Sequence, residues 1–320
     1  MKLLEGELLF LYDAKMANPN GDPDEENKPR MDYATGRALV SDVRLKRYLR
    51  DYWLGKGLDI WVRTLDGETV TANERLKALA EEFHRETGKK VNLKTKSEEK
   101  LPPVFVKWLL GRLIDVRLFG ATMTIKGEEA GQGGGLTFTG PVQFSWGYSL
   151  HPVEIVESST ISSHFAGRES DYGTFGKDWR LYYALIAFYG RVSPARGKAT
   201  GLGPEDLDRL EEGLLKALSE EATTRSKLGQ TPRLYLHVRY REGAYPFPPP
   251  GDLRDYVRFV PKDGLEARKV RAIADYTLDL SPLAKALQNI QDAIEEVRVW
   301  RHPELTAEGI EGLPKQSSVS

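Results

Sequence analysis

The sequence predicts an α+β fold of the ferredoxin-like type, with large insertions. Its core elements read strand, helix, strand, strand and then strand, helix, strand, which is compatible with a βαββαβ sheet. Residues 142–149 alternate apolar and polar side chains, the pattern of a strand with one buried face. The 320 residues exceed what a minimal domain needs, so one core with insertions or two lobes is expected.

The first strand is predicted over residues 3–16, and the first helix follows residue 41. In that helix Leu45, Tyr48, Leu49, Tyr52 and Trp53 fall within one arc at 100° per residue. The opposite arc is filled mainly by the cations Arg44, Lys46, Arg47 and Arg50. The Ser41 hydroxyl is placed to cap the helix, and two glycines at 55 and 57 are placed to end it.

The middle of the chain predicts a short strand over 58–63, helices over 73–87 and 103–113, and an extended segment over 117–125. Residues 158–178 are rich in Ser, Gly, Asp and His, which predicts a long loop. Further on we expect strands over 181–189 and 233–240 and a helix over 204–218. Ser281 and Pro282 are typical of a helix start, and the helix is predicted to run from 281 to 299.

Composition narrows the function classes. The chain has 46 basic and 47 acidic residues, a net charge of −1, so any nucleic-acid binding requires its cations to be segregated on the surface. It has no cysteine and no apolar run near the ~20 residues of a membrane span. Without a signal-peptide pattern the expected location is the cytoplasm.

The sequence shows no assembled catalytic or cofactor motif. The glycine-rich stretch 126–135 lacks the Gly-Lys-Ser/Thr ending of a phosphate loop, and the five histidines lack zinc-site spacing. We therefore expect no cofactor, no metal and no enzymatic activity.

The most informative stretch runs from residue 18 to 53. Its first half is turn chemistry, in which Asn, Asp, Pro and Gly predict an ordered polar loop. Two interpretations of the basic arc that follows stay open on composition alone. It is either an ordinary solvated face or a ledge where a helix N-terminus and cations bind phosphates.

This stretch resembles the signature region of the Cas-seven family, the backbone subunits of type I CRISPR surveillance complexes (Cascade), particularly the I-B and I-C branches. The first matching residues are Asn18-Pro19-Asn20-Gly21-Asp22-Pro23-Asp24, Asn27, Pro29-Arg30, Asp32, Thr35-Gly36 and the helix over 40–50. Later matches, in the family's order, are residues 115–120, 139–143 and 173–177. The resemblance covers roughly residues 3–240.

The resemblance implies a modified palm like an RNA-recognition motif, formed by residues 1–57 and 114–245. It further implies helical fingers over 58–113, thumb or loop segments near 126–136 and 158–178, and a C-terminal extension over 246–320 that packs on the palm. The implied function is binding of CRISPR guide RNA (crRNA) as a helical, antiviral ribonucleoprotein filament. Its partners would be guide RNA, target DNA through the guide, copies of the chain arranged head to tail and other Cascade subunits, with no membrane.

The resemblance and the loop composition select RNA-binding candidates. They are Asn18, Asn20, Arg30, Ser41, Arg44, Lys46, Arg47, Arg50, Phe165, Arg168, Phe175, Lys177, Arg225, Lys227 and Arg233. The hypothesis requires the helix cations to face a groove rather than to be buried in acidic pairs. The alternatives are a type III-like metal-dependent endoribonuclease using a loop aspartate among Asp13, Asp22, Asp24 and Asp32, and a scaffold that binds no nucleic acid.

Overall fold

The computed structural model describes residues 3–65, 67–93, 101–126, 133–157, 159–163, 174–221 and 227–319. They form two compact units. One consists mainly of Leu49–Gln143 and Val192–Gly213, and the other of Leu4–Tyr48, Phe144–Arg191 and Leu214–Ser320. The helices α1 (Asp42–Gly55) and α6 (Pro204–Glu220) are each divided between the two units.

The helices are α1 (Asp42–Gly55), α2 (Ala72–Thr87), α3 (Pro103–Arg112), α4 (Ile114–Phe119), α5 (Pro194–Thr200), α6 (Pro204–Glu220) and α7 (Ser281–Gln288). The strands of the first half are β1 (Gly6–Ala17), β2 (Gly21–Asp22), β3 (Lys28–Pro29), β4 (Met31–Asp32), β5 (Arg37–Val40), β6 (Gly120–Lys126), β7 (Gly133–Thr139), β8 (Val142–Phe144) and β9 (Gly147–Ser149). Those of the second half are β10 (Thr160–Ser163), β11 (Thr174–Lys177), β12 (Leu181–Val192), β13 (Gln230–Tyr240), β14 (Arg258–Pro261), β15 (Tyr276–Asp279), β16 (Ile294–Arg301), β17 (Ala307–Glu308) and β18 (Gln316–Ser318).

The larger unit is built on a mixed sheet with the strand order β18-β16-β13-β1-β12-β9-β5-β4. Neighbouring strands pair antiparallel where β1 meets β13 and where β13 meets β16, whereas β16 and β18 run parallel. The α+β prediction is therefore confirmed. No helix among the described residues is both long and apolar enough to cross a membrane.

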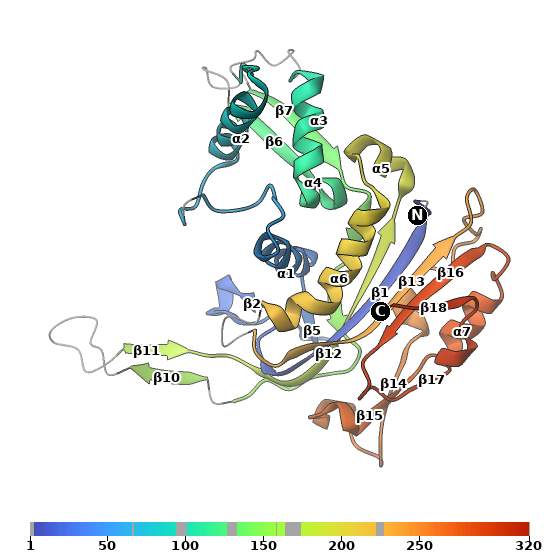
Figure 1. The fold of residues 1–320 in the computed structure, drawn as a ribbon. Helices are drawn as coiled ribbons and strands as arrows, with labels where there is room; N and C mark the ends of the chain where they lie inside the picture. Colours follow the sequence, from blue (N-terminus) through green and yellow to red (C-terminus); the bar gives the residue numbers. More distant parts are fainter. Residues whose placement is uncertain are drawn as a thin grey trace. The chain divides into compact units, whose positions relative to one another are not determined.

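Both faces of the central strands are buried. Because successive side chains of a strand point to opposite faces, Leu9 and Leu11 of β1 face one core, whose members on β12, β13 and α7 pack with them. Leu8 and Phe10 are equally buried on the other face. Figure 1 shows α7 on one side of this sheet.

The smaller unit has a core of its own, supplied by α2, α3, α4 and the β6–β7 hairpin. Phe83 of α2 meets the ring of Phe105 of α3 edge-on, with centroids 5.2 Å apart. Arg117 donates to both carboxylate oxygens of Asp206, at 3.0 and 2.8 Å, in a largely buried ion pair. Gly88 adopts a left-handed conformation and ends α2 after Thr87, where the predicted range 73–87 also ends.

Several sequence predictions need correction. Residues 58–63 form no strand, only an isolated bridge between Asp59 and Leu113. The segment predicted as extended from residue 117 begins instead in α4, and β6 starts at Gly120. The helix predicted over 281–299 ends at Gln288, and the end of the predicted range belongs to β16, which pairs with β13 and buries Ile294 and Val297.

Candidate nucleic-acid interface

The loop that precedes α1 is an ordered structure made of short ladders. β2 pairs with β3 and β4 pairs with β5. Between β2 and β3, Asp22 accepts the Asp24 amide at 3.2 Å and begins a 3-10 turn over Pro23–Glu25. Arg30 then bridges back to the Asp22 carboxylate at 2.9 Å. Turn-forming residues therefore fold this loop by local contacts, as the sequence predicts.

Asn20 fastens this loop to the start of α1. Its side-chain oxygen accepts the Ser41 amide at 2.9 Å and the Ser41 hydroxyl at 3.1 Å. The Ser41 hydroxyl oxygen in turn accepts the Arg44 amide at 3.2 Å, which confirms the predicted N-cap. Asn18 also bonds within the loop, donating to the Asn27 carbonyl at 2.6 Å. The two asparagines therefore act on the loop conformation.

Two predicted cations meet at one aromatic ring. The Arg44 guanidinium lies 4.5 Å from the centroid of Tyr48, and the Lys227 ammonium lies 5.7 Å from the same centroid. The Tyr48 hydroxyl donates to Gln230 on β13 at 3.1 Å, which fixes the ring. Arg44 Nε donates to the Pro19 carbonyl at 3.3 Å and so joins the helix to the loop.

Lys46 and Arg47 complete the cations on the first two turns of α1. Arg47 is exposed. Lys46 forms an i,i+4 ion pair with Asp42 at 2.9 Å. Exposed pairs of this kind on a helix are worth only ~0.3–0.5 kcal/mol, and this pair is partly enclosed, with side chains 12% and 22% exposed.

Arg50 is in a different position and corrects the predicted basic face. Its Nε donates to Asp115 at 2.9 Å, and the Asp115 side chain is only 1% exposed. Breaking a buried pair leaves an uncompensated charge at a cost of about 3–5 kcal/mol. Arg50 therefore serves the fold of its unit and leaves the set of RNA-contact candidates.

Arg233 is corrected for the same reason. It donates to Asp13 at 2.8 Å, and both side chains are buried. Burial raises the pKa of Asp13 even though the Arg233 charge and hydrogen bonds act to lower it. Of the other two members of the predicted second basic group, Arg225 lies outside the described residues, and Lys227 approaches α1.

The remaining candidates lie on or near the β10–β11 hairpin. Lys177 ends β11, is exposed and donates to the Thr160 hydroxyl at 3.2 Å. Phe175 lies on β11, paired with Ser162 in the backbone register. Phe165 and Arg168 fall outside the described residues. The predicted long loop over 158–178 thus contains a two-stranded hairpin.

Three of the loop aspartates considered for the endoribonuclease alternative have structural partners. Besides Asp13 and Asp22, Asp32 accepts the Thr35 hydroxyl at 2.6 Å and the Ala34 amide at 3.0 Å, bonds that lower its pKa. Among the residues that the structure describes, no three His, Asp or Glu side chains gather as metal ligands would.

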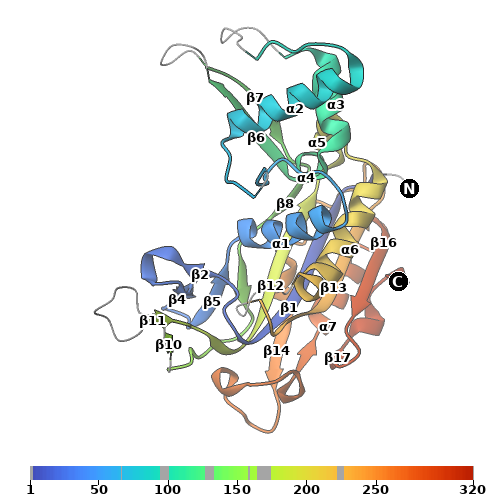
Figure 2. The ribbon, with the colours of Figure 1, turned by 60° about the vertical axis from the view of Figure 1, so that its left-hand side comes forward.

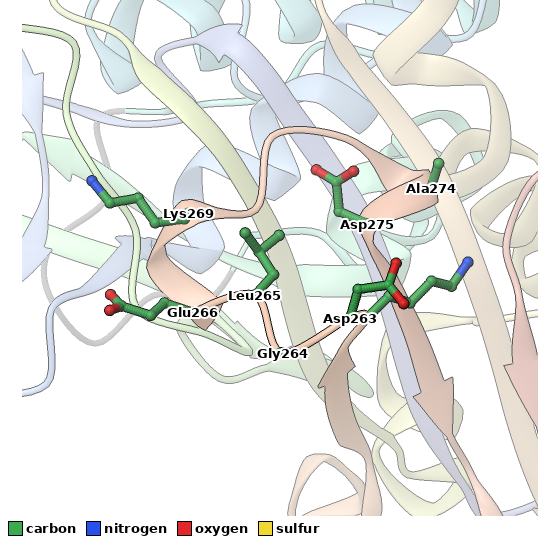
Figure 3. Close-up of a pocket in the computed structure, with 8 residues that line it drawn as sticks. Asp263, Gly264, Leu265, Glu266, Lys269, Ala274 and Asp275 are labelled. Atoms are coloured by element: carbon green, nitrogen blue, oxygen red, sulfur yellow. The ribbon is translucent and has the colours of Figure 1, made fainter.

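A separate hollow of about 560 Å³ lies in the C-terminal part of the chain. Figure 3 shows its lining, which comes from one segment between Lys262 and Asp275. The Asp275 carboxylate is already bound by the amides of Arg271 and Ala272 at 2.8 and 2.9 Å. None of the candidates that the structure describes lines this hollow, so nothing connects it with RNA binding.

Sequence reasoning missed the role of Tyr48, which it assigned only to the packing face of α1. The spacing of Arg44 and Tyr48, four residues apart on one helix, is the signal that could have predicted a cation over the ring. The approach of Lys227 had no local signal, because it depends on where β13 begins beside α1.

Comparison with known proteins identifies the family. Residues 5–281 match the sequence profile described as CRISPR-associated protein Cas7. A CRISPR-associated protein Cas7 of Haloferax volcanii is 32% identical over 312 residues, which cover 93% of this chain and 86% of that protein.

A solved chain described as "CRISPR RNA-guided surveillance complex, pre-nicking" shares the fold. It has a TM-score of 0.51 and 17% identity over 99% of this chain and 96% of that chain. Because the profile covers most of the chain and the relative aligns along nearly all of it, the chain belongs to the Cas7 family of CRISPR-associated proteins.

Proposed function

We propose that this chain is a guide-RNA-binding backbone subunit of a type I CRISPR surveillance complex (Cascade). Copies polymerise head to tail along the guide and present it for pairing with target DNA, with no catalytic step of their own. The observation that carries the proposal is the N-terminus of α1, which hydrogen bonds hold in place. There Asn20 and Ser41 fix the helix N-terminus beside Arg44, Arg47 and Lys227. The family membership supports the same function.

The physical basis is a positive field on a rigid support. The N-terminus of α1 carries part of the helix dipole, which attracts anions. Cations on its first turns extend that field along a strand of phosphates. Phosphate contacts of this kind position a nucleic acid without reading its sequence. A guide whose spacer varies needs such sequence-independent binding, and the target is then selected by base pairing.

The proposed contact set follows from what each cation meets in the fold. Arg44 lies against a backbone carbonyl and an aromatic ring, and Lys46 pairs with Asp42, whose side chain is 22% exposed, so neither balances a fully buried acid in these contacts. Arg47 on the same turns and Lys227 at the Tyr48 ring complete the ledge.

The other candidates have supporting roles. Asn18, Asn20 and Arg30 shape the loop, and Lys177 adds charge from the hairpin. Phe165, Arg168, Phe175 and Arg225 stay proposals that rest on the sequence alone.

The domain assignment is also retained as a proposal. The strand order β13-β1-β12-β9, with α1 following β1 and α6 preceding β13, supports a ferredoxin-like palm. Pairing of β16 and β18 with this sheet supports a C-terminal extension over 246–320 that packs on the palm. The fingers remain assigned to 58–113, and the thumb segments to 126–136 and 158–178. Head-to-tail growth follows from a heterologous contact that does not close into a ring.

The test is a filter-binding titration of single-stranded RNA at several salt concentrations. For a single strand, each phosphate that the protein no longer neutralises should reduce the slope of log K against log salt by about 0.7. Arg44→Gln with Arg47→Gln should therefore lower the slope by roughly 1.4 and weaken binding equally for unrelated RNA sequences.

Two other arginines provide a matched control. Arg241 and Arg258 are exposed by 52% and 70% and belong to longer ion pairs, so Arg241→Gln with Arg258→Gln removes the same charge elsewhere. This control should leave the slope unchanged. Equal slopes for both double variants would contradict the proposed ledge. Co-expression with a guide should also yield a particle that contains several copies of the chain and RNA, and a chain purified without RNA would contradict the filament.

A further inference from the structure

A second group, of two lysines and two aromatic residues, lies away from the acidic pairs of α1. It consists of Lys28 on β3, Tyr33 directly after β4, Lys177 at the end of β11 and Trp179 just beyond it. We call these four residues the Lys28 cluster. Figure 2 shows the β10–β11 hairpin beside β2, β4 and β5 in the larger unit. The cluster thus joins the loop that precedes α1 to the β10–β11 hairpin.

One ammonium contacts two rings at the centre of this cluster. Lys28 Nζ lies 5.5 Å from the centroid of Tyr33 and 5.7 Å from that of Trp179. Lys177 Nζ lies 5.9 Å from the Trp179 centroid. These distances are within the ~6 Å range of cation–π attraction. The indole of Trp179 therefore holds two like charges near each other.

Among the described residues neither lysine of the cluster is neutralised by an ion pair, in contrast to Lys46 and Arg50. The carboxylates of Glu25, Asp32 and Asp178 nevertheless belong to the same loop and hairpin. The aromatic rings attract the ammonium groups but contribute no net charge. An anion placed beside both lysines would therefore gain from their combined field without displacing a carboxylate of the described residues.

The Tyr33 ring is presented rigidly to solvent. It is 65% exposed, while its hydroxyl donates to Glu25 at 3.0 Å. Asp32 holds the turn beneath it by accepting from the Ala34 amide and the Thr35 hydroxyl. Because the hydroxyl is anchored, the ring can stack a partner without first losing much conformational freedom.

The Trp179 ring is held from the other side. The Asp178 amide donates to the Ser159 carbonyl at 2.6 Å, and Arg180 forms an ion pair with Asp178. The indole N–H has no acceptor among the described residues and is shielded from solvent. Trp179 thus acts through its face, as a positioning residue for the two ammonium groups.

We propose that the Lys28 cluster is a stacking subsite for single-stranded nucleic acid, with one base on the face of Tyr33 and the adjoining phosphates on Lys28 and Lys177. An exposed aromatic face beside uncompensated cations is the combination that sequence-tolerant single-strand binding uses. The inference rests on the proposed function and adds an aromatic contact to the phosphate ledge at α1.

The test uses the full chain and single-stranded RNA that carries 2-aminopurine, a base whose fluorescence is quenched when it stacks. Wild-type protein should quench the probe. Tyr33→Ala should abolish the quenching at the subsite and weaken binding at least about fivefold, as expected when one base stack is removed. Tyr33→Phe keeps the ring and should keep both signals. Lys28→Gln with Lys177→Gln should reduce the salt slope by roughly 1.4.

Two controls separate the subsite from general effects. Phe247→Ala removes a ring that is 97% exposed elsewhere in the same unit, and Lys285→Gln removes an exposed lysine of α7. Neither should change quenching or slope. Trp179→Phe should keep part of the contribution of Lys28 and Lys177 to the salt slope, and Trp179→Ala should lose that contribution. Both variants should have the circular dichroism spectrum of the wild type.

The outcomes also separate this inference from the proposed function. If wild-type protein binds no RNA, the proposed function and the subsite both fail. A second outcome is that wild-type protein binds RNA and the double variant Arg44→Gln with Arg47→Gln binds it more weakly. If Tyr33→Ala then quenches the probe and binds RNA as the wild type does, only the subsite is overturned. A weakening in Tyr33→Ala that is equal for single-stranded and fully duplex RNA also overturns it, because duplex bases are already stacked on one another.

Discussion

The pair of Arg50 and Asp115 gives the sharpest prediction about α1. Arg50 was expected to contact RNA, yet its Nε donates to a carboxylate that is almost fully enclosed. The other contacts of Asp115 are the amides of Trp61 at 2.7 Å and Val62 at 3.4 Å. Arg50→Ala removes the only charge that balances this carboxylate among the contacts just described.

The magnitude follows from these contacts. Removing one partner of a buried ion pair destabilises a protein by about 3–5 kcal/mol. Because two backbone amides still solvate Asp115, we expect a loss near the lower end, about 3 kcal/mol. Lys46→Ala, on the same helix, removes an i,i+4 pair with Asp42 and should cost roughly 0.5 kcal/mol. The two substitutions therefore differ by several-fold in their effect on the free energy of unfolding.

The assay is urea unfolding followed by tryptophan fluorescence, since Trp53 and Trp61 belong to the same unit as Arg50. Adding Asp115→Asn to Arg50→Ala removes the orphaned charge and should restore part of the stability. RNA affinity of the folded Arg50→Ala protein should match that of the wild type. A free energy of unfolding within about 1 kcal/mol of the wild type, together with weakened RNA binding, would refute the structural role of Arg50.

Three further predictions concern other parts of the fold. Burial lowers the pKa of His151 to about 4, below the unfolded value of 6.5, so its contribution to the free energy of unfolding is complete above pH 6.5 and should fall by roughly 2 kcal/mol by pH 5. Urea denaturation above pH 6.5 and at pH 5 should therefore show a smaller loss of stability for His151→Asn than for the wild type. An equal loss in both proteins would contradict this prediction. Asn20→Ala leaves the Ser41 amide and hydroxyl without their acceptor and should speed hydrogen exchange over residues 18–41; exchange at the wild-type rate would count against the brace. Gly120→Ala would place a Cβ 2.1 Å from the Phe138 carbonyl oxygen, in a residue whose φ is 74°. It should lower the free energy of unfolding by at least about 2 kcal/mol. A melting temperature equal to that of the wild type would exclude this strain.

Local patterns predicted the parts of the fold that depend on neighbours in sequence. The Ser41 cap, the two-faced α1 and the strands β12 and β13 follow from side-chain spacing and turn residues. The prediction of one helix over 281–299 was wrong because helix propensity alone did not show where the helix ends. The β-branched residues Val297 and Val299 were the available signal for β16.

The candidate site was harder to predict, because the position of a cation on a helical wheel does not show which residues of the folded chain contact it. Arg50 and Asp115 are 65 residues apart, and Arg233 and Asp13 are 220 apart. Only the tertiary structure shows that these cations balance buried acids. The Lys28 cluster is equally non-local, since it joins residues of the first loop to Trp179.

The burial of both faces of the central strands limits where the proposed binding of a nucleic acid can take place. RNA-recognition motifs stack bases on the open surface of a four-stranded sheet, but Leu8, Leu9, Phe10 and Leu11 of β1 are all fully enclosed here. Substitutions in these strands therefore change folding rather than recognition. In the proposed function, the contacts with nucleic acid are therefore left to the first turns of α1, the loop before it and the β10–β11 hairpin.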